Sequence, residues 1–188
     1  MVAQAKRYTR SLVVDQSTTC TGWAIVEHDP HAEVSYGTCG KLIAHGVMRL
    51  KAAAPIARMC ELNADILDAH AKYGGFDEIV YENTAHITQK SAATNEAMAG
   101  ATIVVKDAAK TLNVPVYSQN PMTLKKRFTG NGHADKDAII AAVVTNWGMP
   151  RKDIINGDHA DALAGAYVWL NMADELRAKT KEKKVKKK

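Results

Sequence analysis

Short apolar runs that end in an acidic residue constrain the fold of this chain most strongly. Leu12–Val14 is followed by Asp15, and the β-rich run Asp77–Tyr81 is followed by Glu82. A third run, Gly22–Val26, comes after a polar, turn-prone segment, and this pattern predicts a β-hairpin. The chain therefore begins as a small sheet that carries acids at the ends of its strands.

Helical patterns alternate with strands in the remainder of the chain. Apolar residues recur at helical spacing after Pro55, and a long helix rich in small residues is predicted over Ser91–Leu112. A strand is predicted at Val114–Tyr117, and helices follow at Lys136–Trp147 and from Ala160 to Leu176. Strands that come first and then alternate with helices predict an α/β fold around a mixed sheet. A chain of 188 residues is one domain's worth, which we place at 9–176.

Positive charge is concentrated at the end of the chain. The net charge is +5, but residues 177–188 hold eight Lys or Arg side chains and one Glu, so the rest is close to neutral. Such a block repels itself and predicts a disordered Lys-rich tail. Contact with nucleic acid is the favoured use, because lysines gain affinity by releasing counterions from phosphates. A solubilising tail is the alternative.

Neither a membrane segment nor a disulfide framework is evident. No stretch approaches the roughly 18 consecutive apolar residues that a membrane span needs. Cys20, Cys39 and Cys60 form no CxxC pair, which favours reduced thiols. We therefore expect a cytoplasmic protein with no membrane partner.

Four acidic residues form a candidate metal site. Asp15 and Glu82 end strands, whereas Asp158 and Asp161 lie one helical turn apart at the start of the last helix. Asp158 alone could be a helix N-cap. Asp161 stands among small apolar residues, and a buried charge needs a partner or a metal. An all-oxygen cluster suits Mg²⁺ or Mn²⁺, and two ions can serve phosphodiester cleavage. His159, between two of these acids, is expected to be exposed in the first turn.

These segments resemble the RuvC-type Holliday-junction resolvases. Residues Asp15–Ala24 resemble the opening hairpin of that family, Ile79–Asn83 its second acid at a strand end, and Asp158–Ala164 its D-x-x-D-A-L-A helix start. Lys125 and Lys136 flank a G-x-G loop, at the separation of the two basic residues of the family. The resemblance runs from about residue 11 to residue 170, which is nearly the whole predicted domain.

The resemblance implies an RNase H-like fold, a central mixed five-stranded sheet with helices on both faces, and a homodimer. It implies a crossover junction endodeoxyribonuclease that nicks four-way junctions, and other branched DNA, with two Mg²⁺ or Mn²⁺ ions per active site. The four acids would hold the ions, and Lys125 and Lys136 would meet the scissile or adjacent phosphate. Without the resemblance, the two lysines could equally form a solvated basic face.

The chain departs from the family pattern in two loops. Gln16 stands where bacterial relatives have Pro-Gly, and Ala85–Ile87 stands where they place an aromatic wedge. The Lys-rich tail is also additional. These differences favour a divergent viral branch, which would act in the host cytoplasm with looser sequence selectivity.

Two other functions fit parts of the sequence. The segment Asp15–Gly22 also resembles the first phosphate loop of actin-like sugar kinases, but those enzymes need two such domains. A non-catalytic DNA-binding protein could use the tail and the basic helix alone, yet it would gain nothing from four acids at its contact surface. Incubation with Mg²⁺ and either a junction or ATP plus sugar separates the three functions.

The small-residue helix Ser91–Leu112 carries a candidate dimer interface. A two-fold dimer presents two identical sites to a two-fold substrate, and an Ala/Gly-rich helix face permits close approach. That face comprises Ala93, Ala97, Gly100, Ala101 and Val104. Packing of the same face inside the monomer is the alternative.

Overall fold

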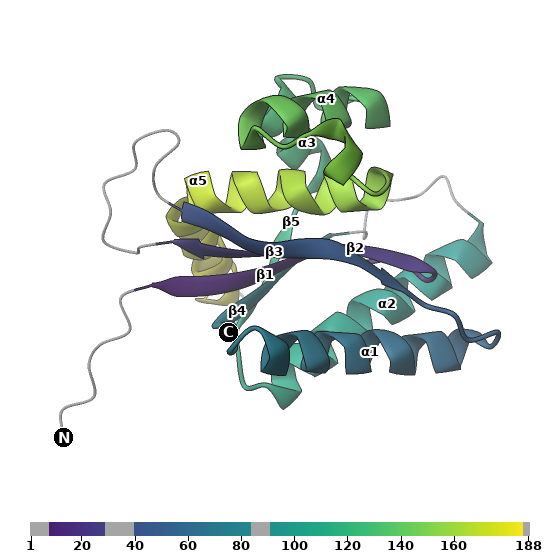
Figure 1. Cartoon of the computed structure of the whole chain (residues 1–188). Coiled ribbons are helices and arrows are strands. Elements are labelled where there is room, and N and C mark those ends of the chain that lie inside the picture. The colour runs from purple at the N-terminus through teal and green to yellow at the C-terminus, as the bar shows by residue number, and fades with distance from the viewer. Residues whose placement is uncertain (1–7, 29–39, 84–90, 186–188) are drawn as a thin grey trace.

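The chain folds as a five-stranded mixed sheet with helices on both faces (Figure 1). The computed structural model describes residues 8–28, 40–83 and 91–185, with side chains described up to residue 171. The strands are β1 (Thr9–Asp15), β2 (Cys20–His28), β3 (Gly40–Arg49), β4 (Glu78–Glu82) and β5 (Val116–Gln119). The helices are α1 (Pro55–Lys72), α2 (Ala92–Thr111), α3 (Pro121–Thr129), α4 (Lys136–Trp147), the 3-10 turn η1 (Arg151–Asp153) and α5 (Gly157–Val185).

The strand order brings two predicted site residues to one edge of the sheet. The order is β3-β2-β1-β4-β5, with antiparallel pairing among the first three strands and parallel pairing of β1 with β4 and of β4 with β5. Val14 of β1 lies opposite Tyr81 of β4. Because parallel neighbours end at the same edge, Asp15 and Glu82 follow this pair side by side. The predicted mixed sheet is confirmed.

The central strand β1 is buried on both faces, which explains its unbroken apolar run. Leu12 and Val14 pack in the core that α1 and α2 cover, and Val13 packs in the core under α3, α4 and α5. This alternation follows from the two-residue period of a strand. Figure 1 shows the two helical layers, with α5 lying along one face of the sheet and α1 and α2 on the other.

Helix α5 packs against the sheet through small residues and buried polar contacts. Ala160 and Ala164 are fully buried, and a Cβ at Gly22 of β2 would overlap the carbonyl oxygen of Asp158. Further along α5, the indole of Trp169 donates to the Glu78 carboxylate at 2.8 Å. The first turn of α5 can therefore lie directly over the β1–β2 hairpin.

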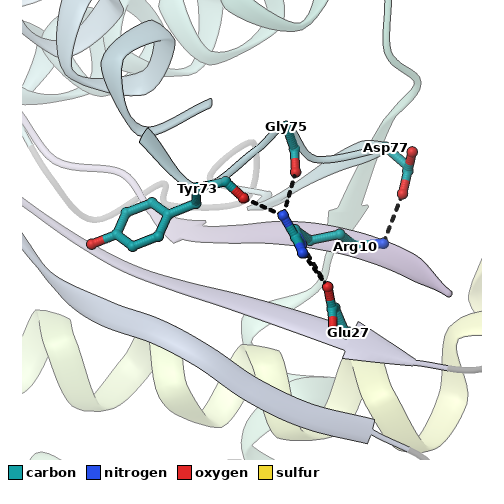
Figure 2. A network of polar contacts seen from close by, with 5 residues as sticks. All are labelled: Arg10, Glu27, Tyr73, Gly75 and Asp77. Carbon is teal, nitrogen blue, oxygen red and sulfur yellow. Dashed lines mark hydrogen bonds and ion pairs between the residues drawn. The ribbon is translucent and has the colours of Figure 1, made fainter. Parts of the chain in front are cut away.

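A second polar network fastens the opposite end of β1 (Figure 2). The Arg10 guanidinium donates to the Glu27 carboxylate of β2 and to the main-chain oxygens of Tyr73 and Gly75, which follow α1. Its main-chain N–H donates to Asp77 at 2.8 Å. One side chain thus joins the hairpin to the α1–β4 connection, far along the strand from Asp15.

The bounds of β5 and α5 differ from the sequence prediction. The strand expected at Val114–Tyr117 begins two residues later, because Val114 N donates back to Ala109 O and Asn113 takes a left-handed conformation (φ 54°) that ends α2. Helix α5 begins at Gly157 rather than Ala160 and continues to Val185, into the predicted tail. The division of the chain at residue 176 stays a prediction.

Among the described residues, no helix combines the length and the apolar character that crossing a bilayer would require.

Candidate active site

Three carboxylates gather where β1 ends beneath the start of α5. Asp15, Asp158 and Asp161 each offer one oxygen, and these oxygens all lie within 4.8 Å of one another. Asp158 and Asp161 face the same way because they are three residues apart on a helix. The predicted approach of strand-end and helix-start acids is therefore present for three of the four residues.

Asn156, and not Asp158, caps helix α5. The Asn156 side-chain oxygen accepts a hydrogen bond from His159 N at 2.9 Å, the spacing of an N-cap residue and the third residue of its helix. Asp158 lies inside the first turn, and its carboxylate accepts from Lys136 Nζ at 2.9 Å. The capping explanation of Asp158 is therefore wrong, and its carboxylate faces the site.

Glu82 acts on this group electrostatically from the neighbouring strand. Burial raises the pKa of Asp15 well above its ordinary value, and the negative charges of Glu82, Asp161 and Asp158 raise it further. Burial likewise raises the pKa of Asp161, whereas the charges of Lys136 and Lys125 lower it. Several carboxylates thus share a poorly solvated region, and each makes ionisation of the others harder.

Both predicted lysines lie at the site, in different ways. Lys136 places Nζ 2.9 Å from Asp158 and 3.7 Å from Asp161. Burial opposes the charge of Lys136, but its hydrogen bond to Asp158 and the nearby carboxylates raise its pKa. A Cβ at Gly157 would overlap its side chain, so that glycine makes room for it. Lys125 donates to Ala134 O at 3.0 Å.

His159 is buried, which corrects the expectation of an exposed first-turn residue. Its Nδ1 accepts from Ile155 N at 3.1 Å, and its Nε2 lies 2.9 Å from Nδ1 of His45 on β3. Because Nδ1 accepts, the proton sits on Nε2, which donates to His45. Burial, with a smaller contribution from His45, lowers the pKa of His159 to about 4. A neutral imidazole pair therefore ties the first turn of α5 to β3.

The sequence carried no signal for this histidine pair. His45 and His159 are 114 residues apart, and they meet only because β3 lies beside β2 under α5. Their rings stack with centroids 4.9 Å apart. Ala85–Ile87, where the sequence departs from the aromatic wedge of the family pattern, lies outside the described residues.

The donor set suits a hard divalent cation. All of the gathered atoms are carboxylate oxygens, the ligands that Mg²⁺ and Mn²⁺ prefer. The raised pKa values of Asp15 and Asp161 mean that ionising both is costly in the protein alone, and a cation at this position would relieve that cost. The residues therefore fit a metal site with cationic side chains at its rim.

Comparison with known sequences gives one family. Residues 12–168 match the family model described as crossover junction endodeoxyribonuclease RuvC. The crossover junction endodeoxyribonuclease RuvC of Nitratidesulfovibrio vulgaris (strain DP4) is 30% identical over 167 residues, which cover 84% of this chain and 88% of that relative.

Comparison with solved structures agrees with the sequence match. The structure of Thermus thermophilus RuvC superposes with a TM-score of 0.68 at 24% identity, over 89% of this chain and 96% of that one. The structure of T. thermophilus RuvC in complex with Holliday junction substrate gives 0.70 at 22% identity, over 92% and 96%. These likenesses confirm the predicted RNase H-like fold.

Proposed function

This chain belongs to the crossover junction endodeoxyribonuclease RuvC family, and on that premise we propose that it nicks four-way (Holliday) junctions by divalent-metal-dependent phosphodiester hydrolysis. Other branched DNA is included as a lesser substrate. The observation that carries the proposal is the meeting of three carboxylate oxygens within 4.8 Å at the end of β1. A DNA substrate also supports the predicted cytoplasmic location.

We assign the metal ligands to Asp15, Glu82, Asp158 and Asp161, with two Mg²⁺ or Mn²⁺ ions per site. When bound, such ions activate a water molecule and stabilise the leaving oxygen. The proximity of the Asp15, Asp158 and Asp161 oxygens supports three of these ligands, and the position of Glu82 at the end of the parallel neighbour β4 supports the fourth. Burial raises the pKa of Asp15, and the neighbouring carboxylates raise it further, which supports a role as metal ligands rather than as a hydrogen-bonded structural cluster.

Lys136 and Lys125 are assigned to the phosphate. The side chain of Lys136 is 61% exposed, so its ammonium can leave Asp158 for a phosphate oxygen without unfolding any element. Lys125 reaches the site from α3, and its charge lowers the pKa of Asp161. Two cationic side chains at the rim would orient the backbone of the DNA and offset the negative charge that develops during cleavage.

We further propose that the protein works as a homodimer, because paired nicks need two related sites. Within α2, Ala101 is fully buried in the monomer, so the inner part of the predicted face is core. Ala93, Ala97 and Gly100 instead border an apolar groove with Ile56 and Met59 of α1. That outer part supports contact with a second copy.

A cleavage gel tests the proposed function. The protein is incubated with a four-way junction, a Y-fork or a linear duplex, each with Mg²⁺ or with EDTA. We expect paired nicks in the junction with Mg²⁺, weaker cleavage of the fork, and an intact linear duplex. The near-isosteric variant Asp15→Asn serves as the inactive control. Equal cleavage of all three DNAs, or cleavage in EDTA, would contradict the proposal.

A further inference from the structure

The side chain of Gln16 is buried directly beside the candidate active site. Gln16 follows Asp15 at the end of β1, and only 1% of its surface is exposed. A buried amide costs stability unless its N–H and carbonyl groups find hydrogen-bond partners. The partners of Gln16 therefore indicate what this side chain holds in place.

Both polar atoms of Gln16 bond to the main chain of Glu82. Nε2 donates to Glu82 O at 2.7 Å, and Oε1 accepts from Glu82 N at 3.2 Å. A main-chain nitrogen can only donate and a main-chain oxygen only accept, so the orientation of the amide is fixed. The backbone pairing of β1 with β4 reaches Val14 and Tyr81. The Gln16 side chain continues that pairing to Glu82 in place of backbone.

The same amide links Glu82 to helix α2, which lies on the face of the sheet opposite α5 (Figure 1). Gln16 Nε2 also contacts Thr102 Oγ1 of α2 at 3.1 Å. On its other flank, Glu82 pairs with Gln119 of β5, and the next residue, Asn83, donates to Gln119 O at 2.8 Å. The main chain of Glu82 is therefore held from β1, from β5 and, through Gln16, from α2.

We propose that Gln16 is a positioning residue that fixes the main chain of Glu82, and with it the direction of the Glu82 carboxylate, relative to Asp15. This inference rests on the proposed function, in which both acids hold metal. The backbone pairing of β1 with β4 stops one residue short of both acids, and the Gln16 side chain supplies the hydrogen bonds between the two strands at that point. Outer-sphere groups of this kind commonly determine metal affinity.

Metal binding without DNA tests the proposal. Mn²⁺ is titrated into the wild type, Gln16→Met and Thr102→Val, and free Mn²⁺ is followed by electron paramagnetic resonance. Gln16→Met keeps similar volume but removes both bonds to Glu82, and we expect it to weaken Mn²⁺ binding about tenfold. Thr102→Val leaves those two bonds in place, so its affinity should stay within about twofold of wild type. Unchanged affinity in folded Gln16→Met would overturn the proposal.

Nuclear magnetic resonance of the wild type provides a test that does not depend on the folding of a variant. The side-chain amide of Gln16 and the main-chain amide of Glu82 should both exchange slowly with solvent. Both should shift with the same Mg²⁺ midpoint. Fast exchange of either amide, or separate midpoints, would overturn the positioning role. A wild type that binds Mn²⁺ as expected but leaves junctions intact would instead overturn the proposed function and preserve this inference.

Discussion

Asp161 combines two opposing properties, since it is a carboxylate removed from water and also lies beside two lysines. Burial dominates and raises its pKa. In the unfolded chain the pKa of Asp161 is near 3.8, and folding raises it. The protonated carboxyl therefore contributes its full stability below pH 3.8, and this contribution is lost as the pH rises through the pKa of the folded protein. In the metal-free protein, ionised Asp161 is therefore destabilising near neutral pH.

We predict that Asp161→Asn is more stable than the wild type in EDTA at pH 7 and yet inactive. The substitution removes a buried charge, so the melting temperature should rise, whereas junction cleavage should fall at least about a hundredfold, because a proposed metal ligand is lost. Thermal melts with EDTA and with Mg²⁺ measure the first effect, and single-turnover cleavage measures the second. An active Asp161→Asn protein would remove this residue from the proposed ligand set.

His159 should make the protein sensitive to acid. Its pKa is about 4 when folded against an ordinary 6.5, so its stabilising contribution is complete above pH 6.5 and is lost as the pH falls toward 4. The loss is of the order of 3 kcal/mol. We expect urea unfolding in EDTA to show a steeper decline between pH 6.5 and 4 in the wild type than in His159→Gln. If the free energy of unfolding fell equally with pH in the two proteins, the imidazole pair would not be the cause of the acid sensitivity.

Helix α5 passes close to the β1–β2 hairpin at Gly22. A methyl group there would overlap the carbonyl oxygen of Asp158, and crowding of this kind typically costs about 1–3 kcal/mol. Gly22→Ala should therefore lower the free energy of unfolding by that amount and also weaken cleavage, because Asp158 moves away from Asp15. Urea unfolding and the junction assay, run together, measure both.

Gly46→Ala is a suitable control for the previous substitution. Gly46 lies on the neighbouring strand β3, where the three atoms nearest to a new Cβ all belong to the Trp23 ring, the first of them at 3.3 Å. We expect this variant to retain cleavage. If Gly22→Ala matched Gly46→Ala in both stability and cleavage, the close approach of α5 to the hairpin would not be required for either property.

The elements that the sequence predicted best are those with local signals. Helix α4 has its predicted bounds, and local groups fix both of its ends, since Asp135 caps it and Gly148 ends it. Asp15 and Glu82 were placed correctly at strand ends. The contacts of Gln16 and His159 were missed, since each depends on strands and helices that meet only in the tertiary structure. Sequence reasoning located the acids, but it could not locate the contacts of Gln16 and His159 that hold the neighbouring main chain in place.

The Lys-rich segment, residues 177–188, carries the excess positive charge of the chain. Truncation after residue 176 should weaken binding to all DNA forms and flatten its salt dependence, because it removes eight cationic side chains that release counterions from phosphates. Cleavage of bound junction should continue, since the proposed ligands all precede the cut. Filter binding at several salt concentrations provides the measurement. An unchanged salt slope would leave the segment with a solubilising role only.

The proposed dimer can be separated from folding at Gly100. A Cβ there would lie 3.8 Å from Met59 Sδ, an ordinary contact, so the monomer should tolerate a longer side chain that projects into the groove between α1 and α2. We expect Gly100→Glu to sediment as a monomer, with a melting temperature close to that of wild type, and to nick junctions without pairing the cuts. A wild type that is monomeric at micromolar concentration and on junction DNA would refute the dimer.

The position of α5 in the chain also determines when a ribosome-bound copy acquires its activity. Asp15 and Glu82 emerge early, but Asp158 and Asp161 follow only after most of the chain has been synthesised. Until then, Val13 and Val80 on one face of the sheet lack Leu163 and Trp169, which cover them in the finished core. A nascent chain therefore has an exposed apolar sheet that invites chaperone binding, and its proposed metal site is incomplete. Nuclease activity in this protein therefore begins only after the first turns of helix α5 have been synthesised and have packed on the sheet.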